Sequence, residues 1–97
     1  MAGMLPRKDT ARAQSNASLR GVAYQIGVLI AIERNRLGLT QEQLGTAIGV
    51  HQVAISNVEN GLAFKVTDAK VDALFTKVGL GAAKRQREFV KWWRENA

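Results

Sequence analysis

Few side chains in this 97-residue chain could carry out chemistry, and their arrangement points away from catalysis. His51 is the only histidine and cysteine is absent, so neither a set of metal ligands nor a thiolate nucleophile can be assembled. Ser15, Ser18 and Ser56 lack a base in any recognisable motif, the carboxylates are scattered, and the glycines form no phosphate loop. We therefore expect a non-enzymatic protein with no cofactor and no metal site.

A second group of polar side chains lies between His51 and Asn60. Read as a helix, this segment turns Ile55 and Val58 inward. Its outward face then carries two amides, a hydroxyl and one small apolar group, which are Gln52, Val53, Ser56 and Asn57. Such a face offers hydrogen-bond donors and acceptors to a partner.

The residues around this face predict two short helices joined by a turn. Thr40 is a predicted N-cap, and Gln43, three residues later, completes a capping box. Gly49 ends the first helix and permits a tight turn, and Gly61 ends the second helix in the left-handed conformation. Two short helices around a glycine-containing turn have the geometry of a helix-turn-helix.

Three further helices are predicted around this motif. A helix over 19–37, ended by Gly38, has apolar residues on one face at Leu19, Val22, Ala23, Ile26, Ile30 and Leu37. A helix beginning at Thr67 or Asp68 follows, and another spans roughly 82–95. Since no stretch has the period of a strand, the predicted fold class is all-α with five helices.

The expected organisation is an arm, a domain and a C-terminal helix. Residues 1–18 are small or polar and lack periodicity, which predicts a disordered, basic arm. The helix-turn-helix domain is expected at 19–80, and a basic, aromatic helix at 81–97. The chain has neither a long apolar stretch nor the hydrophobic region of a signal peptide, so we expect a cytoplasmic protein.

The charge is positive but unevenly distributed. A net charge of +6 favours an acidic partner such as nucleic acid. Residues 37–64 nevertheless contain two acidic and no basic side chains, whereas the segments before and after them each have four more basic than acidic residues.

The segment from Leu39 to Gly61, LTQEQLGTAIGVHQVAISNVENG, resembles the lambda-repressor-like helix-turn-helix family of phage repressors, Cro proteins and XRE-type bacterial regulators. The resemblance extends from about Ile26 to Val78. It rests on matches in register at Gly38, Thr40-Gln41, Leu44, Gly49-Val50, Ile55-Ser56 and Glu59-Asn60-Gly61. It implies a five-helix lambda-repressor-like domain that binds double-stranded DNA and needs no cofactor.

The resemblance also implies roles for individual residues. The family counterpart of Gln41 hydrogen-bonds DNA phosphate, and His51 stands at the cap of the recognition helix, where it either contacts DNA or is simply exposed. The counterparts of Gln52, Val53, Ser56 and Asn57 project into the major groove, where amides can pair with adenine. Arg34 and Glu59 match positions that form a structural ion pair.

The chain departs from the family where basic residues are expected. Family members often carry Lys or Arg in the recognition helix and after the glycine that matches Gly61, whereas this chain continues with Leu62-Ala63-Phe64. The loop that follows is one residue longer and lacks proline. Phosphate attraction must then come from elsewhere, and the candidates are Lys65, Arg36, Arg7, Lys8 and Arg12, of which the last three lie on the arm.

Two apolar faces remain without an assigned contact. The helix over 19–37 has a second stripe nearly opposite its core face, made of Tyr24, Val28 and Ile32. The arm, the C-terminal helix or a partner could cover it. In the C-terminal helix, either a homodimer contact or an intramolecular lid would use Phe89, Trp92 and Trp93. Glu88 and Glu95 interrupt its basic face, which disfavours membrane binding.

The leading hypothesis is a sequence-specific transcriptional regulator, a phage or prophage repressor or a Cro-like protein. It would occupy an operator as a homodimer. The alternative is an antitoxin that uses a similar helix-turn-helix to autoregulate its operon while another surface sequesters a toxin. A nonspecific architectural protein fits the acidic middle segment poorly.

Overall fold

A computed structural model describes residues 16–97, with side chains from residue 18 onward. This part of the chain has no strand and folds into five helices: α2 (Asn16–Arg36), α3 (Gln41–Ile48), α4 (Gln52–Glu59), α5 (Asp68–Lys77) and α6 (Lys84–Asn96). The prediction of an all-α, five-helix fold is confirmed. None of these helices is long and apolar enough to span a membrane.

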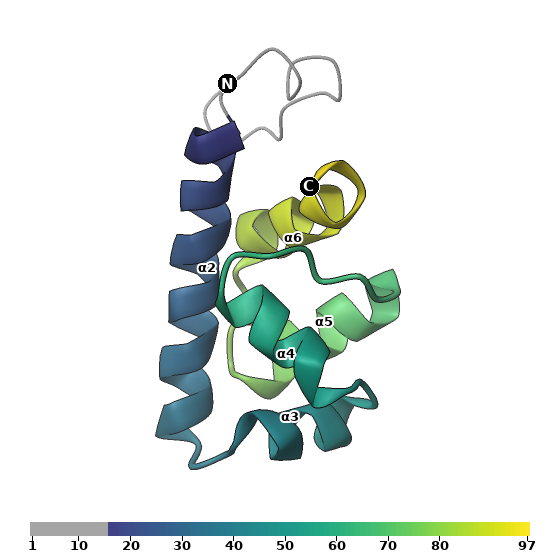
Figure 1. The fold of residues 1–97 in the computed structure, drawn as a ribbon. Coiled ribbons are helices and arrows are strands. Elements are labelled where there is room, and N and C mark those ends of the chain that lie inside the picture. Colours follow the sequence, from purple (N-terminus) through teal and green to yellow (C-terminus); the bar gives the residue numbers. More distant parts are fainter. Residues whose placement is uncertain (1–15) are drawn as a thin grey trace.

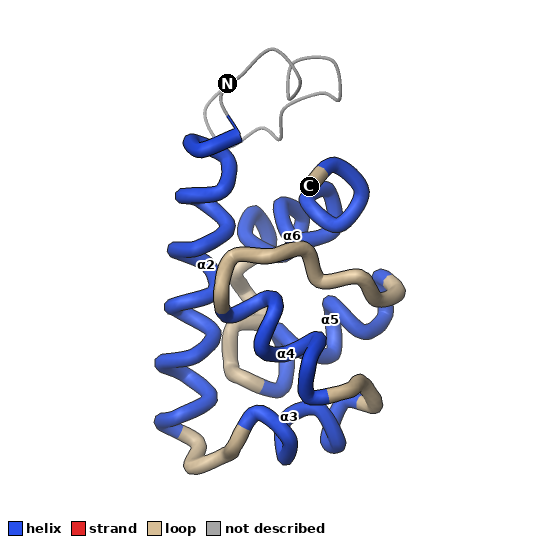
Figure 2. Tube along the Cα trace, viewed as in Figure 1, coloured by secondary structure: helices blue, strands red, loops and turns tan. Residues whose placement is uncertain are grey.

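The long helix α2 runs along one side of the molecule, and the four shorter helices lie on the other side of it (Figure 1). α3 follows at the C-terminal end of α2, and α4 packs against both α2 and α3. α5 and α6 pack against each other, and α6 also contacts α2. The loop from α4 to α5 passes between α4 and α6 (Figure 2), so α6 closes the end of the fold away from α3.

The core lies where these helices meet. Its fully buried large side chains come from α2 to α5 and from the loop after α4: Ile30, Leu44, Ile55, Phe64, Val71, Leu74 and Phe75. Burial of such side chains is worth roughly 1.5 to 3 kcal/mol each. From α6, the indole Nε1 of Trp93 donates a hydrogen bond to the Gly61 carbonyl oxygen at 3.2 Å, which ties α6 to the end of α4.

The core face of α2 is narrower than the sequence predicts. Leu19, Ala23, Ile26 and Ile30 are buried, but Val22 and Leu37 are 42% and 51% exposed, so their assignment to the core is wrong. Val22 lies at the margin of the buried stripe. Leu37 falls after the last helical residue, Arg36, in a turn that Gly38 completes at a φ of 74°. The helix also begins at Asn16, three residues before the predicted start.

The second apolar stripe of α2, formed by Tyr24, Val28 and Ile32, lies on the surface. These side chains are 54%, 38% and 48% exposed. The C-terminal helix, one of the covers considered, does not cover them, and its Phe89 and Trp93 are buried in the core instead. The arm, the other intramolecular cover considered, falls in residues 1–15 and lies outside the described part of the chain.

The aromatic residues of α6 form an intramolecular lid. Phe89 and Trp93 are buried, Trp92 is half-buried, and the rings of Phe89 and Trp93 stack with their centroids 5.8 Å apart. Phe89 and Trp93 are thus occupied within the monomer and are not exposed for a contact with a second copy.

Three of the five basic side chains of α6 face carboxylates of α5. Arg94 Nη2 lies 2.7 Å from Asp68 Oδ1, and Lys91 Nζ and Arg87 Nε each lie 3.1 Å from Asp72 Oδ1. The hydrogen bond with Asp72 raises the pKa of Lys91, and the hydrogen bond with Asp68 raises the pKa of Arg94. Much of the positive charge of α6 is therefore balanced by carboxylates of α5.

Candidate nucleic-acid interface

The turn between α3 and α4 is specified by short-range interactions. The Gln43 amide donates to Thr40 Oγ1 at 3.0 Å, and the Thr40 amide donates to Gln43 Oε1 at 2.9 Å, so the predicted capping box is present. Gly49 ends α3 with a φ of 79°, in the left-handed region that favours glycine. The next amide, of Val50, donates to the Gly45 carbonyl oxygen at 2.8 Å. The turn therefore has one defined geometry.

Two glycines allow the helices to approach closely. A β-carbon on Gly45 would lie 2.7 Å from the Val50 carbonyl oxygen, inside the turn. A β-carbon on Gly27, in α2, would overlap the Val58 carbonyl oxygen and lie 2.5 Å from the Glu59 carbonyl oxygen. The close approach at Gly27 could not be predicted from the sequence, because it depends on where α4 crosses α2.

A mostly buried cluster of polar side chains fixes α4 against α2 and α3. Arg34 Nε donates to Glu59 Oε2 at 2.6 Å and Arg34 Nη2 to Glu59 Oε1 at 3.1 Å, so the ion pair implied by the resemblance is present and bidentate. Arg34 also donates to the Leu39 carbonyl oxygen at 2.7 Å. Since the two charged side chains are only 12% and 6% exposed, this cluster joins the end of α2 to the end of α4 in a weakly solvated setting.

Gln41, the predicted phosphate ligand, is attached to the same cluster. Its Nε2 donates to Glu59 Oε1 at 2.9 Å, and its side chain is half-buried at the first position of α3. This contact orients the carboxamide of Gln41 and leaves its oxygen and its second amide hydrogen outside the ion pair. Neither the spacing nor the resemblance predicted this bond.

The outward face of α4 has the composition that the sequence predicts. Gln52 and Val53 are exposed, Ser56 and Asn57 are half-buried, and Ile55 and Val58 point into the core. Among residues 16–97, no side-chain hydrogen bond engages the amides of Gln52 and Asn57. These amides are available to a partner that approaches the first two turns of α4.

His51 is the N-cap of α4. Its Nδ1 accepts a hydrogen bond from the Val53 amide at 3.0 Å, and the side chain is exposed. The position at the cap agrees with the resemblance. The cap satisfies one of the amides that every helix leaves free in its first turn.

The predicted phosphate-binding cations are scattered. Arg36 is 72% exposed at the end of α2 and lies 3.8 Å from Glu33. Lys65 lies in the loop after α4, where its Nζ donates to the Arg94 carbonyl oxygen at 3.0 Å. Arg7, Lys8 and Arg12 lie outside the described residues.

One lysine that the sequence analysis did not single out supports the helix-turn-helix. Lys70, in α5, donates from Nζ to the Ile48 carbonyl oxygen at 3.0 Å, at the C-terminal end of α3. A cation at this position is favoured by the partial negative charge of a helix C-terminus. No local sequence signal predicts the contact, because the two residues are brought together only by the tertiary fold.

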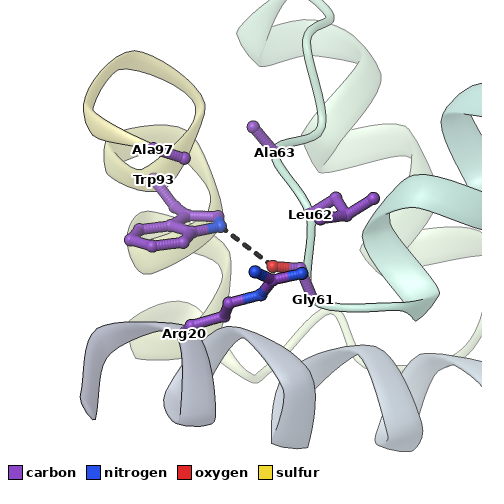
Figure 3. A pocket seen from close by; sticks show the side chains of 6 residues that line it. All are labelled: Arg20, Gly61, Leu62, Ala63, Trp93 and Ala97. Atoms are coloured by element: carbon purple, nitrogen blue, oxygen red, sulfur yellow. Dashed lines mark hydrogen bonds between the residues drawn. The ribbon is translucent and has the colours of Figure 1, made fainter. Parts of the chain in front are cut away.

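A shallow pocket of about 220 Å³ lies at the other end of α4, between α2, α6 and the loop (Figure 3). It is lined by Arg20, Gly61, Leu62, Ala63, Trp93 and Ala97. The hydrogen bond from Trp93 to the Gly61 carbonyl oxygen joins two of these lining residues. The described residues contain no group of histidine, aspartate and glutamate side chains that could hold a metal ion.

Comparisons with known proteins agree with this geometry. Residues 30–74 match the family model described as Helix-turn-helix. Over 64 residues, the chain is 41% identical to an uncharacterized HTH-type transcriptional regulator of Acanthamoeba polyphaga mimivirus. The alignment covers 64% of this chain but only 28% of that protein, and no solved structure matches the chain. Nothing in these comparisons favours the antitoxin alternative.

Proposed function

We propose that this chain, whose residues 30–74 match the family model described as Helix-turn-helix, is a sequence-specific transcriptional regulator that reads double-stranded DNA with the outward face of α4. The observation that carries the proposal is that α4 is held in a fixed position while the side-chain amides on its outward face make no hydrogen bond to the described residues. The close packing at Gly27 and the ion pair between Arg34 and Glu59 fix the helix. The amides of Gln52 and Asn57 remain exposed or half-exposed on its free side.

The chemistry of that face suits base edges in the major groove. The groove admits an α-helix, and Gln or Asn can pair with the N6 and N7 atoms of adenine through two hydrogen bonds. Val53, 57% exposed beside Gln52, offers an apolar contact of the kind that a thymine methyl group makes. Ser56 adds a hydroxyl that can act as donor or acceptor.

Phosphate contacts would come from the start of α3 and from nearby cations. The first amides of α3 and its positive dipole end favour an anion, and Gln41 stands at its first position, oriented by Glu59. Arg36, exposed at the end of α2, supplies a cation before α3 begins. Such contacts set the position of a protein on the duplex, and base contacts then select the sequence.

The proposal includes a homodimer that occupies an operator and blocks transcription. Two copies would place their α4 helices about 34 Å apart on one face of a near-palindrome. The exposed stripe of Tyr24, Val28 and Ile32 is the contact surface we assign, because Phe89 and Trp93 are used within the monomer. Light scattering on the free protein, with Val28→Glu as the disrupting variant, tests this part separately from DNA binding.

The main test is selection of bound duplexes from a random pool with the full chain. We then expect Gln52→Ala and Asn57→Ala each to weaken binding to the selected duplex by about 1 to 3 kcal/mol and to leave binding to a scrambled duplex nearly unchanged. Gln86→Ala, which removes an amide from α6, is the matched control and should bind both duplexes like the unaltered protein. Equal losses on both duplexes, or no enrichment from the pool, would contradict the proposal.

A further inference from the structure

The cap of α4 differs chemically from the caps of α3 and α5. Thr40 and Thr67 cap α3 and α5 with hydroxyl oxygens, whereas α4 is capped by a ring nitrogen, Nδ1 of His51. Nδ1 accepts the Val53 amide hydrogen at 3.0 Å. A ring nitrogen can accept only when it carries no proton, so in the neutral ring the proton must be on Nε2. The cap therefore fixes the tautomer of His51.

The same contact fixes the direction of the remaining donor. Nε2 lies across the imidazole ring from Nδ1, and Nδ1 is turned toward the backbone of α4. The Nε2–H group is consequently directed away from the helix start. His51 and the next two residues, Gln52 and Val53, are all exposed. A threonine in this position would keep its hydroxyl donor at the capping oxygen itself, whereas the imidazole ring carries a donor farther from the helix start.

We infer that His51 is a DNA-contacting residue that donates a hydrogen bond from Nε2 to an acceptor atom on DNA while Nδ1 holds the start of α4. The inference rests on the proposed function and adds to it a donor of fixed direction at the leading end of the recognition helix. Phosphate oxygens and the N7 and O6 atoms of guanine share the required chemistry, because each accepts a hydrogen bond. The N4 amino group of cytosine, which is a donor, does not fit.

The first experiment examines the tautomer in the free full-length protein. Since His51 is the only histidine, its ring ¹⁵N signals have no competitors in a long-range ¹H–¹⁵N spectrum. At about pH 8 we expect a protonated Nε2 and an unprotonated, hydrogen-bonded Nδ1. A ring that carries its proton mainly on Nδ1 would overturn the inference without any bearing on whether the protein binds DNA.

The second experiment separates the donor from the cap. His51→Thr keeps an oxygen for the cap, as at Thr40 and Thr67, but removes the Nε2–H donor, whereas His51→Ala removes both. We expect His51→Thr to keep the thermal stability of the unaltered protein and to bind the selected duplex roughly three- to tenfold more weakly, the range for one hydrogen bond. His51→Ala should lose stability as well.

The outcomes distinguish this inference from the proposed function. A loss confined to the selected duplex assigns the acceptor to a base, and an equal loss on selected and scrambled duplexes assigns it to phosphate. If His51→Thr binds as tightly as the unaltered protein while Gln52→Ala still loses discrimination, the inference about His51 fails and the proposed function stands. If the unaltered protein enriches no duplex, both fail.

Discussion

The two helix contacts α2–α4 and α5–α6 are held together by different means. α2 approaches α4 at Gly27, where no side chain fits, and the contact is completed by the buried ion pair of Arg34 with Glu59. α5 and α6 share a core, but the carboxylates that join them, Asp68 and Asp72, are 62% and 49% exposed. The first contact allows few alternative arrangements, whereas water can replace the polar part of the second.

This difference fits the tasks we assign to the two regions. A helix that presents side chains to base edges must keep a fixed angle, because hydrogen bonds weaken steeply when donor and acceptor are misaligned. A helix that closes a core needs apolar burial more than an exact angle. We therefore expect substitutions at the α2–α4 contact to cost more than comparable ones at the α5–α6 contact.

The largest effect is expected at the buried ion pair. Arg34→Met should lower the free energy of unfolding by about 3 kcal/mol, because it leaves the Glu59 carboxylate buried with only Gln41 as a side-chain partner. Urea denaturation measures the change. Arg36→Met, on the same helix but 72% exposed, is the matched control and should change stability by less than about 0.5 kcal/mol.

The double variant Arg34→Met with Glu59→Met sharpens this prediction. With both charges removed, much of the lost stability should return, since no isolated charge remains in the core. Equal losses of stability for Arg34→Met and Arg36→Met would contradict our description of the α2–α4 contact as tightly constrained.

The next largest effect is expected at the close approach of the backbones. Gly27→Ala places a methyl group against the carbonyl oxygens of Val58 and Glu59, so we expect a loss of about 2 kcal/mol and a shifted α4. Gly21→Ala, in the same helix and with nothing within 4 Å of the added carbon, should instead be neutral or stabilising by about 0.5 to 1 kcal/mol. Thermal unfolding of the two variants compares them directly, and similar losses in both would show that helix propensity, not contact, sets the cost.

The sequence predicts the parts of this fold that depend on neighbours along the chain. Thr40 with Gln43, and the left-handed glycines Gly49 and Gly61, follow local rules of capping and turns, and the structure has them as predicted. Val22 is misassigned because hydrophobic spacing gives the direction of a helical face but not its width.

Most contacts between residues that are far apart in the sequence cannot be predicted from such local rules. The ion pair of Arg34 and Glu59 is expected only from the family resemblance. The hydrogen bond from Lys70 to Ile48 can be predicted only if the packing of α5 against α3 is known. The requirement for glycine at position 27 can be predicted only if the crossing point of α2 and α4 is known. In the candidate site, the polar face of α4 follows from helical spacing, whereas the attachment of Gln41 to Glu59 does not.

The smallest effect is expected at the α5–α6 ion pairs. Asp72→Asn should lower the free energy of unfolding by less than about 1 kcal/mol at neutral pH, because the Asp72 side chain is 49% exposed and solvent screens its ion pairs with Lys91 and Arg87. Glu42→Gln, a neutralised exposed carboxylate at the start of α3, is the control for loss of charge alone. A loss near 3 kcal/mol for Asp72→Asn would contradict the difference that we describe between the α2–α4 and α5–α6 contacts.

The ion pair of Lys91 with Asp72 also predicts that the stability of the fold falls at alkaline pH. The hydrogen bond with Asp72 raises the pKa of Lys91 above its ordinary value of 10.5, so folding favours the charged amine. The stability that this contributes is fully present below pH 10.5 and is lost as the pH rises through the higher value in the folded protein. The unaltered protein should therefore lose more stability than Asp72→Asn between about pH 10 and 12 in urea titrations. Parallel curves for the two proteins would mean that Lys91 gains nothing from Asp72 in solution.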